Sequence, residues 1–258
     1  MHFIYPEWDA PPNIGALSTT RRGGVSMAPY GDGMGGGGLN LGAHAGDCRH
    51  GVEHNRSLLR AAIPVLPVWL SQVHGTAVLD AVNVKNAAVQ SVQADACIAT
   101  QGGVACAILT ADCLPVLLCD ALGRTVGAAH AGWRGLAGGI LENTVSRMRD
   151  AGAEDILAWL GPAIGPACFE VGTDVLAAFG DRQPKALDAF QAIAGRPGKY
   201  LADIYALARM RLQSAGVRRI YGGVFCTVSE QRFYSYRRDG VTGRMASLIW
   251  IDEKHIAK

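Results

Sequence analysis

Three side chains that could bind a metal ion stand at the ends of short apolar runs. Cys113 lies in Thr110-Ala-Asp-Cys, His130 ends Thr125-Val-Gly-Ala-Ala-His, and His74 lies in Trp69-Leu-Ser-Gln-Val-His-Gly75. A thiolate and two imidazoles suit zinc, and zinc with three protein ligands keeps a fourth position for water or substrate. The residue types therefore indicate a catalytic zinc site. The long spacing leaves another interpretation open, a buried cysteine and two hydrogen-bonded core histidines.

Strands are the elements that must position these ligands. The apolar runs 104–109, 115–119 and 125–129 predict three buried strands, with a turn over 120–124 that contains Gly123. Cys113 and His130 would then lie where strands pass into loops. A further strand pair is expected within residues 3–20.

A helix is predicted directly after His130. Apolar residues recur at helical spacing between Leu136 and Arg149, which is typical of an amphipathic helix. The free N–H groups at its start and the guanidinium of Arg134 would together favour an anion beside the metal ligand. The alternative is an ordinary strand–helix turn with Arg134 in solvent.

The motifs around the three ligands resemble those of the laccase-domain family. They read Ser-Gln-Val-His-Gly, Ala-Asp-Cys-Leu-Pro and His-Ala-Gly-Trp-Arg-Gly, around His74, Cys113 and His130. Members of the family have been called polyphenol oxidases, purine nucleoside phosphorylases and peptidoglycan editing factors. The resemblance runs nearly end to end, from Thr20-Arg-Arg-Gly-Gly-Val-Ser26 through Leu39-Asn-Leu-Gly42 to Phe233-Tyr-Ser-Tyr-Arg-Arg-Asp-Gly240. It implies that His74, Cys113 and His130 hold the metal.

The same resemblance suggests which residues bind the substrate. Arg21 corresponds to an arginine near the family's substrate, and Asn40 and His44 lie in the motif and loop that approach the site. Arg134 and Arg237 are further candidates for binding phosphate, and Arg237 could also bind ribose. The alternative for the arginines is a surface charge or, for Arg237, an ion pair with Asp239.

Two carboxylates and one thiol are candidates for catalysis. Asp112 adjoins Cys113, so it could orient a ligand imidazole or transfer protons, or it could be a turn residue. Glu170 stands between Phe169 and Val171 in a loop that, by resemblance, lines the cleft. Burial there would suit it to acid–base work, and a structural salt bridge is equally compatible with the pattern. Cys113 itself could act as a nucleophile instead of a ligand. Asp95 is expected to begin another apolar strand, and the alternative is a turn residue.

A rival metal site is suggested by two histidines on the helix predicted over 47–62, with Asp47 as its N-cap. His50 and His54 are four residues apart and therefore share a face, close to Cys48. Apolar residues lie on the opposite side of that helix, so we expect both histidines to face solvent.

A glycine-rich stretch at 31–38 does not predict phosphate binding. It contains six glycines in eight residues, but the Gly-Lys-Ser/Thr of a P-loop does not follow. We therefore expect a flexible loop.

Length and composition exclude several classes of protein. The chain has 258 residues, 49% hydrophobic and 18% charged, which indicates a folded globular protein. The net charge of +2 includes no basic run, so a nucleic-acid partner is not expected. No signal-peptide pattern and no run of about 20 apolar residues is visible, so no membrane association is expected. Seven cysteines without a Cys-x-x-Cys pair suggest reduced thiols in the cytoplasm.

The predicted fold class is α+β, a single domain over 1–258. Mixed β-sheets would be covered by helices near 47–62, 135–150, 173–179 and 201–215. The family resemblance implies a zinc enzyme acting on purine nucleosides and phosphate. Its expected reactions are phosphorolysis of adenosine and inosine, cleavage of methylthioadenosine, and some adenosine deamination.

Two other activities remain open at this point. A zinc amidohydrolase could remove a wrong amino acid from a peptidoglycan precursor with the same residues. A copper polyphenol oxidase is less compatible, because seven histidines are too few for several copper centres. One His₂Cys centre could still bind copper in place of zinc. The oligomeric state is left open.

Overall fold

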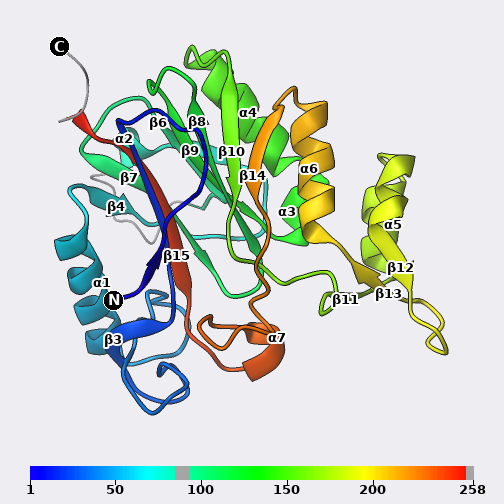
Figure 1. The fold of residues 1–258 in the computed structure, drawn as a ribbon, viewed down its shortest axis with the longest axis horizontal. Helices are drawn as coiled ribbons and strands as arrows, with labels where there is room; N and C mark the ends of the chain where they lie inside the picture. Colours follow the sequence, from blue (N-terminus) through cyan, green and yellow to red (C-terminus); the bar gives the residue numbers. More distant parts are fainter. Residues whose placement is uncertain (85–92, 254–258) are drawn as a thin grey trace.

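Two stacked β-sheets form the centre of the protein, and helices cover both outer faces (Figure 1). The computed structural model describes residues 1–84 and 93–253. The first sheet has the strand order β1 (Phe3–Ile4), β2 (Ile14–Thr19), β15 (Met245–Ile251), β7 (Val104–Thr110) and β4 (Leu66–Val68). The second has the order β14 (Arg219–Gly222), β10 (Ile156–Leu160), β8 (Leu114–Asp120), β9 (Val126–Ala131), β6 (Ala96–Ala99) and β5 (Val78–Asp80).

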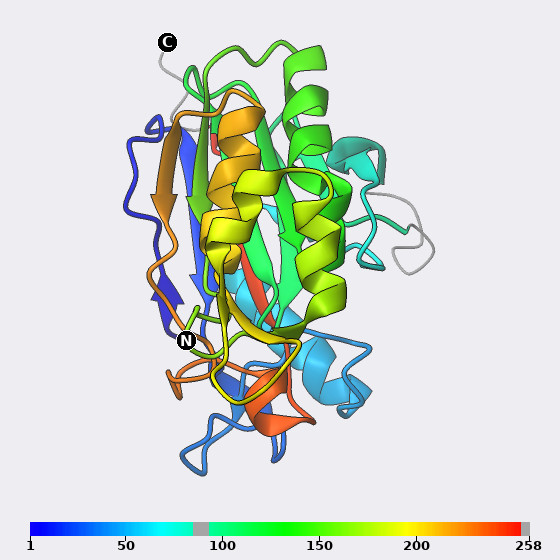
Figure 2. The same ribbon diagram turned by 90° about the vertical axis from the view of Figure 1, so that its right-hand side faces the viewer.

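Both sheets are mixed. The pairs β4–β7, β10–β14 and β5–β6 are parallel, and their other neighbours are antiparallel. A smaller antiparallel sheet of β11 (Glu170–Gly172), β13 (Lys199–Ala202) and β12 (Phe190–Ala192) projects to one side with α5 (Thr173–Gly180) (Figures 1 and 2). The short strand β3 (Arg22–Ser26) lies beside α1 (Arg49–Ala62). The α+β class with mixed sheets is confirmed.

Alternate residues of the central strands pack into separate apolar layers. Leu117 of β8 packs between the two sheets with Ile249 of β15, whereas Val116 and Leu118 point into the layer under the helices. That outer layer is covered by α3 (Trp133–Gly138), α4 (Ile140–Asp150) and α6 (Ile204–Ser214). On the other side, Leu59 of α1 covers the first sheet. Strands buried on both faces explain why their sequences are continuously apolar.

The strand predictions are confirmed within a few residues. The runs expected at 104–109, 115–119 and 125–129 are β7, β8 and β9, and the pair expected within 3–20 is β1 and β2. However, β7 and β8 belong to different sheets, so the turn containing Cys113 crosses from one sheet to the other. His130 lies inside β9 and not in the following loop.

Two helix predictions need correction. The helix expected over 135–150 begins at Trp133 and breaks at Gly139, whose φ of 106° ends α3 before α4 starts. A left-handed residue cannot continue an α-helix, and glycine adopts this conformation without steric cost. Asp47 does not cap α1: its carboxylate accepts hydrogen bonds from the Asn40 amide and the Cys48 N–H, and the helix begins at Arg49.

The remaining helices agree better with the sequence. The helix expected at 173–179 is α5, and the one expected at 201–215 is α6, which begins only at Ile204. Leu201 and Ala202 instead end β13, and the Asp203 carboxylate caps α6 by accepting the N–H groups of Tyr205 and Ala206. Short helical turns complete the fold: α2 (Ala81–Val84), η2 (Pro184–Ala189) and α7 (Tyr236–Asp239). Among the described residues, no helix has the length and apolarity to cross a bilayer.

Candidate functional site

Three chain segments bring the predicted metal ligands together. Antiparallel pairing of β8 with β9 sets Leu114 opposite Ala131, so Cys113, just before β8, lies next to His130. His74 approaches from the loop after β4. The Cys113 Sγ and His74 Nε2 atoms are 3.8 Å apart, and donor atoms of all three residues lie within 4.8 Å of one another. The strand register therefore accounts for a cluster that the long sequence spacing concealed.

Asp95 holds two of these ligands in place. Its buried carboxylate contacts His130 Nδ1 at 2.8 Å and accepts the His74 N–H at 2.9 Å. It also accepts the N–H groups of Val73, at 3.1 Å, and Gly75, at 2.7 Å. His74 has a φ of 61°, a conformation that a non-glycine residue rarely adopts and that needs support from its surroundings. Asp95 supplies that support and leaves His130 Nε2 free to face the cluster.

The sequence interpretation of Asp95 as the start of a strand, or alternatively as a turn residue, missed this role. The available signal was a carboxylate directly before an apolar strand, Gln-Ala-Asp-Ala-Cys97, where burial without a partner is costly. Nothing in the sequence pairs it with position 130. Its partner is set by the pairing of β6 with β9, which aligns Ala96 with Ala129.

The ligand side chains shift one another's pKa values. Burial acts against the charged form of Cys113, yet the adjacent His130 and His74 lower its pKa to about 6. Burial likewise acts against a charged His130, but Cys113 and the hydrogen bond to Asp95 raise its pKa to about 9. Without a metal, these opposite shifts favour the thiolate form of Cys113 and the protonated form of His130. A thiolate is also the form of cysteine that binds metal ions.

The donor set fits a single zinc ion. Tetrahedral zinc bonds of about 2.0–2.3 Å place neighbouring donors roughly 3.5 Å apart, close to the 3.8 Å between Cys113 Sγ and His74 Nε2. His74 is exposed and Cys113 half-buried, so a fourth position would be open to solvent or substrate. A carboxylate bonded to the remote nitrogen of a ligand histidine is the usual support for such a site.

A cavity of about 280 Å³ opens over the cluster. Apolar and aromatic side chains form much of its wall, and two arginines also line it. The lining residues are His74, Ala111, Asp112, Cys113, Trp133, Arg134, Ile164, Phe169, Ile204, Tyr236 and Arg237. The Arg134 guanidinium stacks on the Trp133 ring, 4.4 Å from its centroid. A few polar groups around an apolar wall are typical of small-molecule sites.

Asp112 lines this cavity but does not orient an imidazole. Its carboxylate accepts the Thr227 hydroxyl at 2.5 Å and the Arg237 N–H at 2.6 Å. Asp112 thereby fixes the start of α7, which presents Tyr236 and Arg237 to the cavity. The orienting role expected for Asp112 belongs to Asp95. A role of Asp112 in proton transfer stays a prediction.

Glu170 forms a structural ion pair. Arg196 donates two hydrogen bonds to its carboxylate, at 2.5 and 2.8 Å, and Glu170 is half-buried and outside the cavity lining. This pairing corresponds to the salt-bridge alternative for Glu170, and a role of Glu170 in acid–base catalysis stays a prediction. The Arg237 side chain donates to the Glu170 carbonyl oxygen at 3.0 Å, which holds Arg237 over Phe169.

The other residues assigned to substrate binding lie outside the cavity lining. Arg21 is buried; its guanidinium donates to the Gly31 carbonyl and stacks on Tyr234. Asn40 is fully buried: its amide donates to Asp47, and its carbonyl accepts the N–H groups of Gly42 and Arg244. Their visible contacts brace the 31–42 segment, and substrate contact stays a prediction for both.

His44 is exposed and has basic neighbours. Partial desolvation of its ring by the surrounding chain, with the charges of Arg244 and Arg56, lowers the pKa of His44 below its usual value. Arg244 is not recognisable as a site residue from the sequence, although its charge and that of Cys113 act on one another. The rival pair His50 and His54 is exposed on α1 and joins no metal-binding cluster among the described residues.

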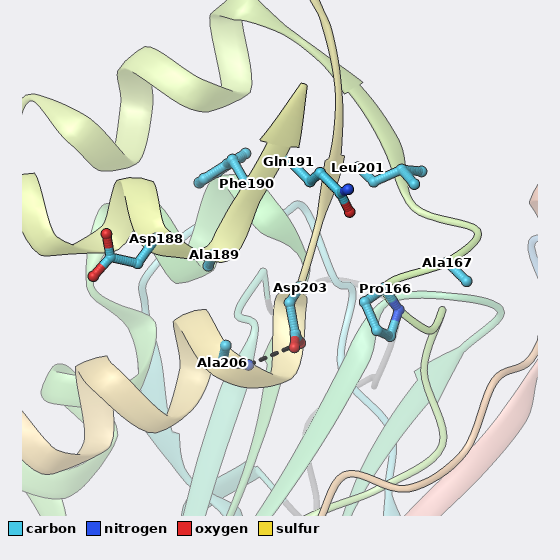
Figure 3. Close-up of a pocket in the computed structure, with 9 residues that line it drawn as sticks. All are labelled: Pro166, Ala167, Asp188, Ala189, Phe190, Gln191, Leu201, Asp203 and Ala206. Carbon is cyan, nitrogen blue, oxygen red and sulfur yellow. Dashed lines mark hydrogen bonds between the residues drawn. The ribbon is translucent and has the colours of Figure 1, made fainter. Parts of the chain in front are cut away.

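A second cavity of about 450 Å³ lies beside the smaller sheet (Figure 3). Segments from β12, β13 and the start of α6 form it together with Pro166 and Ala167. The Asp203 carboxylate at its floor caps α6 (Figure 3). None of the predicted site residues lines this cavity, so it is separate from the cluster around Cys113.

Comparison with known proteins identifies the family. The model of the family described as multi-copper polyphenol oxidoreductase laccase matches residues 15–252. The chain belongs to this family. It is 53% identical over 251 residues to purine nucleoside phosphorylase YfiH of Escherichia coli K12, which covers 96% of this chain and 98% of that protein. It is 49% identical over 252 residues to purine nucleoside phosphorylase PA4543 of Pseudomonas aeruginosa, covering 97% and 99%.

Solved structures of the family share the fold. The Neisseria meningitidis protein NMB0706 matches with a TM-score of 0.89 and 49% identity, over 98% of this chain and 100% of that one. YlmD of Geobacillus stearothermophilus matches with a TM-score of 0.83 and 34% identity, over 94% and 93%.

The laccase description of the family does not match the metal-binding groups of this chain. Within residues 1–84 and 93–253, the one cluster of at least three such side chains is His74, Cys113 and His130. Several copper centres built mainly from imidazoles would need more histidines than this cluster offers. The cluster has room for one ion.

Proposed function

We propose that this protein is a zinc-dependent purine nucleoside phosphorylase. Its relatives at about half identity bear that name. The observation that carries the proposal is the convergence of His74, Cys113 and His130 at one end of a cavity that Arg134 and Arg237 also line. The cavity of about 280 Å³ is near the lower end of ligand-site volumes, roughly 300–1,000 Å³, and suits a nucleoside.

In this proposal different residues bind the purine and the phosphate. Trp133, Phe169 and Tyr236 form a surface on which a purine can stack. The guanidinium groups of Arg134 and Arg237 bind phosphate and hold it against the ribose C1′ carbon. A phosphate oxygen then attacks C1′ while the bond to the purine nitrogen breaks.

The metal would be held by the three ligands, with Asp95 fixing two of them. A bound zinc ion would supply Lewis-acid stabilisation of negative charge on the substrate. Cys113 serves as a thiolate ligand in this scheme and not as the nucleophile, because phosphate attacks directly. Copper could occupy the same donors, since its affinity for such sites exceeds that of zinc.

The finer assignments belong to the same proposal. The substrates are adenosine, inosine and methylthioadenosine, with adenosine deamination as a side reaction at the same site. We also propose that residues 1–258 form one domain and that the protein acts in the cytoplasm. The alternative is hydrolysis of an amino acid from a peptidoglycan precursor by the same metal site.

One experiment separates these activities. Zinc-loaded protein is incubated with inosine and phosphate, with adenosine, and with a muramoyl-serine precursor, and products are identified by chromatography and mass spectrometry. We expect hypoxanthine and ribose 1-phosphate to form in equal amounts, and no hypoxanthine without phosphate. Release of serine with no phosphorolysis would instead support the amidohydrolase. Cys113→Ser serves as the inactive reference, and His50→Ala with His54→Ala serves as the matched histidine control.

A further inference from the structure

Two cysteines that do not belong to the metal cluster lie close together, next to residues that line the cavity of about 280 Å³. Cys168 lies in the turn before β11, and Cys226 lies in the turn after β14. Their thiols are close enough for Cys226 to act on the pKa of Cys168, and both are partly exposed. Gly165 holds the two segments together: its N–H donates to Cys226 Sγ at 3.3 Å, and its carbonyl oxygen accepts the Cys168 N–H at 3.0 Å.

The two thiols differ in chemical character. Burial acts to raise the pKa of Cys226, but the neighbouring polar groups of Ser229, Gly165 and Val228 lower it below its usual value, and the Gly165 N–H donates directly to the sulfur. Burial raises the pKa of Cys168, and the neighbouring Cys226 raises it further. Cys226 is therefore the better source of thiolate, the form that attacks oxidants and disulfides. An exposed thiolate beside a second thiol is the arrangement of redox-active cysteine pairs.

We propose that Cys168 and Cys226 form a reversible disulfide, with Cys226 as the attacking residue and a peroxide as the oxidant. The Cys226 thiolate attacks one peroxide oxygen, forming an S–O bond while the O–O bond breaks and hydroxide leaves. Cys168 then attacks the Cys226 sulfur, forming the S–S bond, and the displaced hydroxide leaves as water with the Cys168 proton. Overall, two thiols are oxidised to a disulfide while hydrogen peroxide is reduced to two water molecules.

A second thiol pair in the same chain provides a contrast. Cys97 of β6 and Cys106 of β7 are also neighbours, but both are fully buried between the sheets. The neighbouring Cys97 and burial raise the pKa of Cys106, so its thiol stays protonated. Peroxide does not reach this pair in the folded protein. Both pairs are close together, but only Cys168 and Cys226 are accessible to solvent. Accessibility therefore makes them the pair that peroxide can oxidise.

The proposed bond would act directly on the cavity wall. Cys168 precedes Phe169, which lines the cavity, and Cys226 precedes Thr227, which donates to Asp112. The sulfur–sulfur distance in a disulfide, about 2.05 Å, is much shorter than the distance between two sulfur atoms that are not bonded. Closing it draws the 165–169 and 225–227 segments together, at the point where Arg237 donates to the Cys168 carbonyl.

The test maps the cross-link in the full, zinc-loaded chain. Protein is treated with hydrogen peroxide, its remaining thiols are alkylated, and non-reduced peptides are analysed by mass spectrometry. We expect one linked peptide pair, containing Cys168 and Cys226, and loss of two of the seven thiols. Dithiothreitol should restore both. Cys168→Ser should let a sulfenic acid accumulate on Cys226, trapped by dimedone, whereas Cys226→Ser should give neither cross-link nor label at Cys168.

Controls separate the proposal from general oxidation. Cys97→Ser should leave the cross-link unchanged, and thermal unfolding of the reduced serine variants should show that each is folded. Absence of the Cys168–Cys226 peptide, a bond that joins either residue to Cys113 instead, or dimedone labelling of Cys168 in place of Cys226 would each overturn the proposal.

Discussion

Gly132→Ala should weaken zinc binding without changing any ligand. A Cβ atom at position 132 would lie 2.8 Å from His74 Cδ2, 3.2 Å from Cys113 Sγ and 3.5 Å from His130 Cε1. Gly132 has φ −59° and ψ 152°, which alanine adopts freely, so the backbone itself tolerates the change. The substitution therefore acts on the ligand side chains, with little effect on the fold.

The size of the effect follows from the closest contact. Carbon atoms pack best at about 3.5–4.0 Å, so the His74 ring must move by roughly 0.7 Å from its 2.8 Å position. Metal–ligand distances tolerate only about ±0.2 Å. Four hydrogen bonds to the Asp95 carboxylate restrain the 73–75 loop and the His130 ring, so neither can follow freely. We expect a loss of zinc affinity of roughly 10–100-fold, the usual range for disturbed ligand orientation.

Competition with a chromophoric chelator measures this affinity, and thermal unfolding of metal-free protein measures the fold. Gly51→Ala is the matched control, because its Cβ would meet only Ser26 Oγ at 3.8 Å, an ordinary contact in α1. It should leave zinc affinity unchanged and stabilise the protein by up to about 1 kcal/mol. A zinc affinity of Gly132→Ala within threefold of the wild type would refute the steric argument.

Three further changes test the site. Asp95→Asn should lower zinc affinity about 10–100-fold and destabilise the metal-free fold by roughly 1–3 kcal/mol, because its NH₂ would face backbone donors; unchanged melting of the apoprotein would contradict this. Cys113→Ser should abolish phosphorolysis and leave cooperative unfolding intact, whereas full wild-type activity in metal-free protein, checked by elemental analysis, would show that zinc is dispensable. His50→Ala with His54→Ala should leave zinc content unchanged; loss of the bound zinc would identify the wrong histidines.

Local patterns in the sequence predicted many of the strands and helices. The apolar runs of β7, β8 and β9 are long enough to predict strands, because residues buried on both faces of a sheet need no polar alternation. The periodic residues of α4 and α6 predict helices for a similarly local reason. The types of the three ligands, and the motifs around them, indicated a metal site and the laccase-domain family before any contact was known.

The departures from these predictions are mostly nonlocal. Asp95 and Asp112 are both acidic residues beside a strand, and sequence alone cannot decide which one meets His130. The antiparallel register of β6 with β9 decides it, while Asp112 is taken by Thr227 and the start of α7. The environment of Glu170 is likewise set by a distant residue, because Arg196 donates to its carboxylate from a separate turn.

Residue types and apolar periodicity therefore determined which elements form and which atoms could bind a metal. Only the tertiary structure decided which of those atoms meet, because hydrogen bonds and ion pairs between distant segments depend on strand register. The same reason explains the two thiol pairs. The sequence does not indicate which cysteines become neighbours; in the fold, one pair is buried between the sheets while the other is partly exposed.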